Sequence, residues 1–149
     1  MGIGEDIKQA KFTSEYSKAI INILYSNSWL IQKHSDLLKP SGITIPQFNV
    51  LRILRGQYPK PATVNLLIER MLDKSSNASR IVDKLEEKRF VERKKCKFDK
   101  RAVDVVITDK GLELLQNLDV QLNAYEERNK KLTDEECETL NALLDKMRS

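Results

Sequence analysis

Glycine, proline and cysteine are scarce in this sequence of 149 residues, which contains five glycines, four prolines and two cysteines. Cys96 and Cys137 cannot build a disulfide framework, and their spacing fits no metal-ligand motif. No apolar run exceeds three residues, which excludes a transmembrane helix and the hydrophobic core of a signal peptide. We therefore expect a soluble protein of the cytoplasm with no membrane partner.

Residue types that support catalysis are scarce as well. His34 is the single histidine, and the sequence contains no glycine-rich phosphate loop, no nucleophile elbow and no metal-binding spacing. These absences exclude the common kinds of enzyme active site. We predict that the protein is not an enzyme and has no catalytic residue, cofactor or metal.

The positive charge of the chain is concentrated in one segment. Residues 84–101 contain nine basic and four acidic residues, an excess of +5, which is larger than the +4 of the whole chain. Residues 133–149 contain five acidic and two basic residues. A basic segment beside a neutral-to-acidic remainder is typical of a surface that binds a polyanion.

The spacing of apolar residues predicts three helices before the basic segment. Residues up to about 39 form one long helix with an apolar seam at alternating spacings of four and three, and this broad face needs another helix to cover it. Thr44 and Gln47 predict a capping box at the start of a second helix. A third helix begins at Thr63. The core faces of the second and third helices are expected to be Phe48, Leu51, Ile53 and Leu54, and Val64, Leu67, Ile68, Met71 and Leu72.

A fourth helix has one apolar and one polar face. Ala78, Ile81, Val82 and Leu85 follow the i, i+3, i+4, i+7 spacing of a buried helical face, and Asp73 or Ser75 can cap the helix. Capping does not explain four short polar residues and an arginine within two turns. Such side chains form hydrogen bonds with base edges and phosphates. The polar face is expected to consist of Ser75, Ser76, Asn77, Ser79, Arg80, Asp83 and Lys84.

A basic β-hairpin and two further helices complete the order of elements. Strands are predicted over residues 90–95 and 102–108, joined by a charged tip. A fifth helix runs from Thr108 to about residue 130, and a capping box at Thr133 opens the last helix. The fold class is therefore mainly α with a small antiparallel β wing. A polar-faced helix followed by a basic hairpin is typical of a winged helix-turn-helix, in which the helix enters the major groove of DNA.

Residues 43–111 closely resemble the multiple-antibiotic-resistance regulator (MarR) family. The resemblance rests on residues 43–48 at the helix entry, 79–86 in the recognition helix, and 90–93, 99–101 and 107–111 in and after the wing. It implies a homodimeric transcriptional regulator in which the N- and C-terminal helices form a dimerisation region and two winged lobes contact successive major grooves. The expected single domain spans residues 1–149, with the DNA-binding lobe at about 40–111 and the dimerisation region at about 5–39 and 112–149.

The expected partners are double-stranded DNA, a second copy of the chain and, for many similar proteins, a small aromatic or anionic effector that releases DNA. Arg101, steadied by Asp99, is expected to enter the minor groove while nearby lysines meet phosphates. The candidate DNA-binding residues are Ser75, Ser76, Asn77, Ser79, Arg80, Lys84, Lys95, Lys97, Asp99, Lys100 and Arg101.

The chain departs from the family at Arg89, where glycine is usual. An arginine there must adopt a less favourable backbone conformation or shift the end of the helix. The reactive cysteine that peroxide-sensing members carry in their first helix is also missing, because no cysteine precedes Cys96. Two other functions remain open from the sequence: a winged-helix module that binds protein, and an architectural protein that binds DNA without sequence preference.

Overall fold

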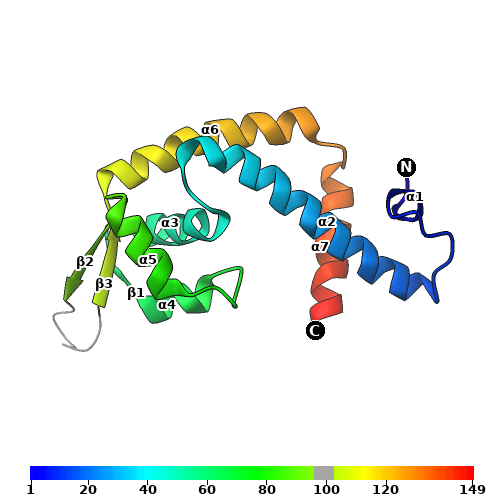
Figure 1. The fold of residues 1–149 in the computed structure, drawn as a ribbon, viewed down its shortest axis with the longest axis horizontal. Helices are drawn as coiled ribbons and strands as arrows, with labels where there is room; N and C mark the ends of the chain where they lie inside the picture. Colours follow the sequence, from blue (N-terminus) through cyan, green and yellow to red (C-terminus); the bar gives the residue numbers. More distant parts are fainter. Residues whose placement is uncertain (96–102) are drawn as a thin grey trace. The chain divides into compact units, whose positions relative to one another are not determined.

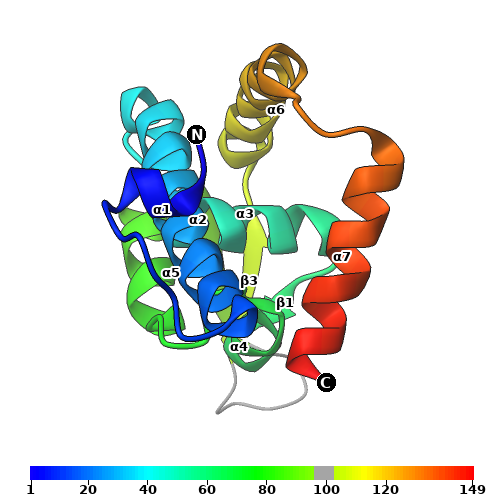
Figure 2. The ribbon, with the colours of Figure 1, turned by 90° about the vertical axis from the view of Figure 1, so that its right-hand side faces the viewer.

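The N-terminal part of the fold is helical. The computed structural model describes residues 1–95 and 103–149, and Figure 1 shows the course of the chain. Helix α1 spans Ile3–Asp6 and packs against α2, which spans Glu15–Leu38 (Figure 2). Ser14 caps α2 by accepting a hydrogen bond from the Ser17 amide. A 3₁₀ turn, η1 (Lys39–Ser41), then leads into Gly42, whose φ of 71° suits a glycine.

Three helices and a small sheet form the winged lobe. Helices α3 (Ile45–Gln57), α4 (Val64–Arg70) and α5 (Ala78–Glu87) are followed by the antiparallel strands β2 (Val91–Lys95) and β3 (Val103–Ile107). Strand β1 (Ala62–Thr63), which the sequence did not predict, pairs with β3, so that the strand order is β1-β3-β2. The predicted mainly α fold with a small antiparallel β wing is confirmed.

Two helices end the chain, α6 (Asp109–Asn129) and α7 (Asp134–Arg148). The capping boxes predicted at Thr44 and Thr133 are both present, with Gln47 and Glu136 as the reciprocal partners. The chain divides into two compact units, residues 1–115 and 116–149. The first unit therefore contains the whole winged lobe and the first turns of α6.

Aliphatic side chains fill the core of the winged lobe. The most fully buried of them come from all three helices and from both strands of the hairpin, namely Val50, Leu51, Leu54, Leu67, Val82, Leu85, Val91 and Val105. The predicted core face of the third helix was wrong at two positions, because Ile68 is half-exposed and Leu72 is 86% exposed. Helix α4 ends at Arg70, so Leu72 no longer follows the helical spacing.

Helix α5 ends in a Schellman motif that contains a left-handed arginine. The Phe90 amide donates to the Leu85 carbonyl at 3.0 Å, and the Arg89 amide donates to the Glu86 carbonyl at 2.9 Å. Arg89 has a φ of 64°, so that of the two alternatives left open by the sequence the chain adopts the less favourable backbone conformation. The helix therefore ends where glycine would be most favourable, with an arginine in its place.

Replacing Arg89 with glycine should stabilise the protein by about 1 kcal/mol, because glycine adopts the left-handed conformation without a Cβ clash. For a chain of this size the melting temperature should rise by about 2–4 °C. Arg89→Ala is the matched control, since it removes the same side chain and keeps the strain. Thermal unfolding of the three proteins measures the difference, and equal gains from alanine and glycine would assign the effect to the lost guanidinium.

Candidate nucleic-acid interface

Asn77 is the residue that caps helix α5. Its side-chain oxygen accepts a hydrogen bond from the Arg80 amide at 3.1 Å, and the helix begins at Ala78. The prediction that Asp73 or Ser75 caps this helix was therefore wrong. Ser75 and Ser76 precede the helix and lie in the turn that follows α4, whereas Ser79, Arg80 and Lys84 lie on α5 itself.

Asp73 organises the turn between α4 and α5. Its carboxylate accepts hydrogen bonds from the Ser75 amide at 2.9 Å, the Ser75 hydroxyl at 2.6 Å and the Ser76 hydroxyl at 3.0 Å. These bonds, the one from the Ser75 hydroxyl above all, hold the pKa of Asp73 below its ordinary value. Both candidate serines therefore carry hydroxyl groups that are already engaged within the turn.

Two further side chains tie the same turn to its surroundings. The Lys74 ammonium donates to the carbonyls of Ile68 and Glu69 near the end of α4. The Asn49 side chain, from α3, accepts a hydrogen bond from the Leu72 amide at 3.0 Å. Sequence reasoning missed both residues, since nothing local marks a lysine or an asparagine as a partner of backbone groups in another element.

A cavity of about 310 Å³ lies between the start of α3 and the start of α5. It brings together four of the predicted DNA-binding residues, Ser76, Asn77, Arg80 and Lys84. Its remaining lining is Thr44, Pro46, Gln47 and Ile81. Hydrogen-bond donors and two cationic side chains thus converge where α5 begins, which is the kind of surface that contacts phosphates and base edges.

The guanidinium groups of Arg80 and Arg93 differ in whether an acidic side chain pairs with them. Arg80 is exposed, and within the described residues its side chain makes no ion pair or hydrogen bond. Arg93, on β2, pairs through Nη2 with Asp83 at 2.5 Å and through Nη1 with Glu86 at 3.5 Å, both on α5. Arg93 is one of the nine basic residues of the segment 84–101, but its charge is matched by acidic side chains of the protein itself.

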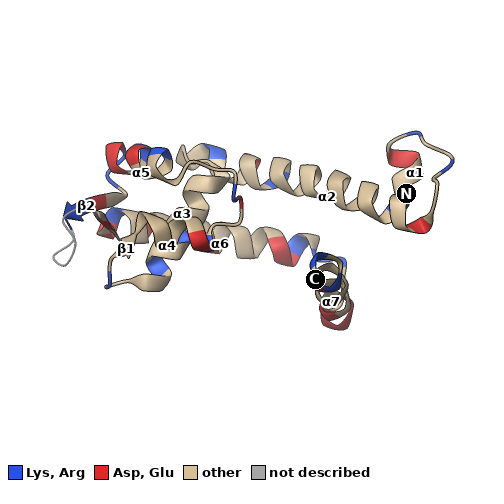
Figure 3. Cartoon of the chain, turned by 90° about the horizontal axis from the view of Figure 1, so that it is seen from below, with Lys and Arg blue, Asp and Glu red and all other residues tan. Residues whose placement is uncertain are grey.

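Some of the remaining candidate residues lie in the part of the chain that the structure describes, and others lie outside it. Ser79 is exposed on α5, Lys84 pairs with Glu87 at 3.3 Å, and Lys95 is exposed at the end of β2. Figure 3 shows acidic and basic residues interspersed along α5 and basic residues at the far end of β2. Four predicted wing residues lie outside the described residues, namely Lys97, Asp99, Lys100 and Arg101.

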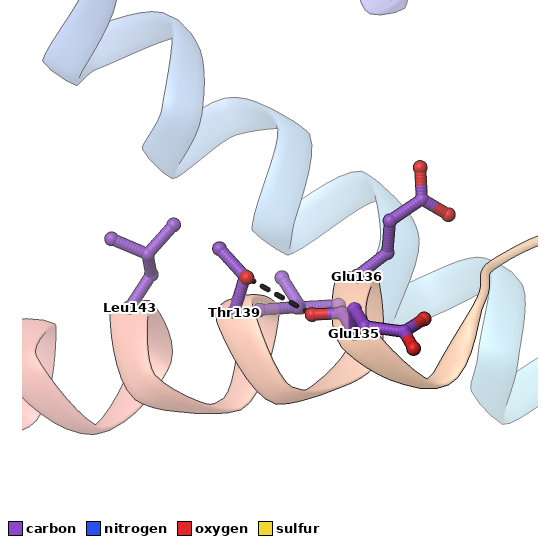
Figure 4. Close-up of a pocket in the computed structure, with 5 residues that line it drawn as sticks. Glu135, Glu136, Thr139 and Leu143 are labelled. Carbon is purple, nitrogen blue, oxygen red and sulfur yellow. Dashed lines mark hydrogen bonds between the residues drawn. The ribbon is translucent and has the colours of Figure 1, made fainter.

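Apolar side chains are exposed along α2. They include Tyr16, Ile20, Ile23, Leu24, Leu30 and Ile31, with Leu24 62% exposed. In the second unit, Leu140 and Leu143 of α7 are exposed beside a shallow hollow of about 320 Å³. Figure 4 shows the Leu143 and Thr139 side chains on one side of α7, where Thr139 donates to the Glu135 carbonyl. These surfaces have the apolar character of an interface.

No helix among the described residues has both the length and the apolar character that crossing a membrane requires. Over the same residues, no cluster of three or more histidine, cysteine or acidic side chains could hold a metal ion.

Comparison with known proteins gives matches that agree with this geometry. The model of the MarR family matches residues 43–103. The HTH-type transcriptional regulator SarZ of Staphylococcus epidermidis is 28% identical over 129 residues, which cover 85% of this chain and 84% of SarZ.

Solved structures of Escherichia coli MarR are similar over nearly the whole chain. A mutant MarR is 30% identical, with a TM-score of 0.64, over 85% of this chain and 93% of that chain. A mutant MarR in complex with operator DNA is 28% identical, with a TM-score of 0.76, over 93% of this chain and 99% of that chain. The match to the DNA complex extends beyond the winged lobe to the terminal helices.

Proposed function

This chain belongs to the MarR family of transcriptional regulators, and on that premise we propose that it is a homodimeric repressor that binds a pseudo-palindromic operator in double-stranded DNA. As a member of this family the chain is a regulator and not an enzyme. The cavity at the start of α5, where Asn77, Arg80 and Lys84 converge, is the observation that carries the proposal. We propose that the protein acts in the cytoplasm, where it meets its operator DNA.

In the proposed complex, α5 lies in the major groove and its first turns contact the bases. Arg80 has a free guanidinium among the described residues, and arginine recognises guanine through a bidentate pair of hydrogen bonds. Ser76, Asn77 and Ser79 contact bases or adjacent phosphates, and Ser75 contacts a phosphate after exchanging its bond with Asp73. Lys84 contacts the backbone, since it lies one turn further along the helix.

The wing contacts the flanking DNA. Lys95, at the exposed end of β2, meets a phosphate together with Lys97 and Lys100, and Arg101 enters the minor groove while Asp99 steadies it. The proposed second copy of the chain packs against the exposed apolar face of α2, with α7 contributing Leu140 and Leu143. A two-fold dimer of this kind imposes its symmetry on the operator.

Selection of duplexes from a random pool by the purified protein should yield a pseudo-palindromic site. The two half-sites should lie about one helical turn apart, roughly 34–36 Å, because that is the spacing of successive major grooves. A duplex carrying one half-site is the control and should bind more weakly. Salt-dependent binding without an enriched sequence would favour an architectural DNA-binding protein, and no binding to any duplex at low salt would favour a protein-binding module.

A small aromatic or anionic effector remains part of the proposal. Solved structures that share this fold include an organohalide-sensing transcriptional regulator bound to 2,4-dichlorophenol, at 20% identity, and a Streptomyces coelicolor transcriptional regulator bound to its natural ligand, at 23% identity. At these identities the likeness to this chain shows the fold alone. The effector is therefore proposed by chemical class, and screening aromatic carboxylates and phenols for release of the selected duplex would test it.

A further inference from the structure

Arg93 joins the wing to the recognition helix. Its guanidinium bonds to Asp83 at 2.5 Å, to Glu86 at 3.5 Å and to the Ser79 carbonyl at 3.2 Å, all on α5. The Arg93 amide also donates to the Glu86 carboxylate at 3.1 Å. The side chain is 27% exposed, so that these bonds form in a partly desolvated place where a charged pair is stronger than at the surface.

The alternation of strand β2 links Arg93 to Lys95. Val91, Arg93 and Lys95 lie on the same face of the strand, because successive side chains of a strand point to opposite faces. Val91 is buried, Arg93 is partly covered and Lys95 is exposed. Lys95 lies about 6.6 Å along the strand from Arg93, at a rise of about 3.3 Å per residue. The bonds of Arg93 therefore fix the part of β2 from which Lys95 projects.

We propose that Arg93 is a positioning residue for DNA binding, which fastens β2 to α5 and thereby sets where Lys95 meets the DNA backbone relative to the recognition helix. This inference rests on the proposed function, since it assumes that α5 and the wing bind the same duplex. It assigns to Arg93 an indirect role, whereas Lys95 makes the contact itself. Arginine suits this role because its planar fork can bond two carboxylates and a carbonyl at once.

Replacing Asp83 and Glu86 with uncharged residues distinguishes a positioning role of Arg93 from a general effect of charge on DNA binding. Asp83 and Glu86 lie on the same helix as the DNA-contacting residues, and both carboxylates are about half exposed. If charge alone mattered, Asp83→Asn with Glu86→Gln would reduce repulsion of phosphates and leave the contribution of Lys95 unchanged. If Arg93 positions the wing, the same double variant should reduce the contribution of Lys95.

The experiment measures the effect of Lys95→Ala on binding to the selected duplex in three backgrounds. These are the wild type, Arg93→Met, and the double variant Asp83→Asn with Glu86→Gln. One phosphate contact contributes about 0.9 to the slope of log affinity against log salt, or roughly an eightfold gain in affinity from 1 M to 0.1 M salt. Lys95→Ala should therefore lower the slope of the wild-type dimer by about 1.8, through two wings.

In the other two backgrounds, Lys95→Ala should change the slope and the affinity by much less, because the lysine is no longer held in register with α5. Arg93→Lys should restore part of the Lys95 effect, since an ammonium can bond one carboxylate but not all three partners. The matched control background is Glu87→Gln, which removes an acidic residue that pairs with Lys84 and not with the wing. There the full effect of Lys95→Ala should persist.

A full effect of Lys95→Ala in either Arg93→Met or the acidic double variant would overturn the proposal. So would the absence of any Lys95→Ala effect in a wild type that binds the duplex, and that result would leave the proposed function intact. If Arg93→Met does not fold, which its thermal unfolding would reveal, the double variant decides alone. A wild type that binds no duplex at low salt would instead contradict the proposed function itself.

Discussion

Leu24→Glu should convert the protein from a dimer into a folded monomer with a mass near the 17.2 kDa of one chain. Leu24 is 62% exposed on α2, so that a glutamate costs the isolated chain little. In the proposed dimer, the same substitution places two carboxylates in an apolar interface, where burying an unpaired charge costs several kcal/mol. Sedimentation at micromolar concentration measures the change in mass.

The same variant should bind the two-half-site operator about 10²–10⁴-fold more weakly, because linking two binding modules raises avidity by about that factor. Asn22→Glu is the matched control. It introduces the same charge on the same helix, about 200° away around the helix axis at 100° per residue. The control should stay dimeric. A wild type that sediments as a folded monomer, or a Leu24→Glu variant that remains a dimer, would contradict the proposed homodimer.

Arg80→Ala should weaken binding to the selected operator by about 1–3 kcal/mol for each protomer, which is about 30-fold to 10⁴-fold for a dimer. The guanidinium is exposed and forms no bond within the described residues, so its loss should leave the melting temperature nearly unchanged. Preference at one or two base pairs of each half-site should be relaxed, because a base-reading side chain has been removed. Repeating the duplex selection with the variant measures this directly.

Arg128→Ala provides the charge-matched control for Arg80→Ala, since it removes an exposed arginine from α6. If Arg80 acts through general attraction to DNA, both variants should weaken binding similarly and the selected sequence should stay the same. If Arg80 reads a base, its variant alone should alter the selected sequence. An unchanged sequence with Arg80→Ala would remove this residue from the set of base-reading residues.

Local features of the fold were predictable from the sequence. The capping boxes at Thr44 and Thr133 depend on residues three positions apart, and both are present. The left-handed conformation of Arg89 was one of two alternatives that its departure from the family's usual glycine left open. These features share a physical basis, since each is determined by hydrogen bonds within one or two turns of chain.

Features that depend on distant residues were not predictable in the same way. Several short polar residues precede α5, and which of them caps the helix depends on where the preceding turn ends; Asn49 of α3 bonds to that turn from 23 residues away. Strand β1 has two residues and exists because β3 lies beside it. Arg93 could be recognised as basic, but its pairing with Asp83 depends on the packing of β2 against α5.

The turn between α4 and α5 also bears on how fast the protein can bind. Asp73, Lys74 and Asn49 already fix this turn in the chain without DNA. A segment that is ordered beforehand loses little conformational entropy when the complex forms, and no folding step has to precede contact. The rate constant of association is then governed by diffusion and by attraction between the basic surface and the phosphates, and it falls as the salt concentration rises.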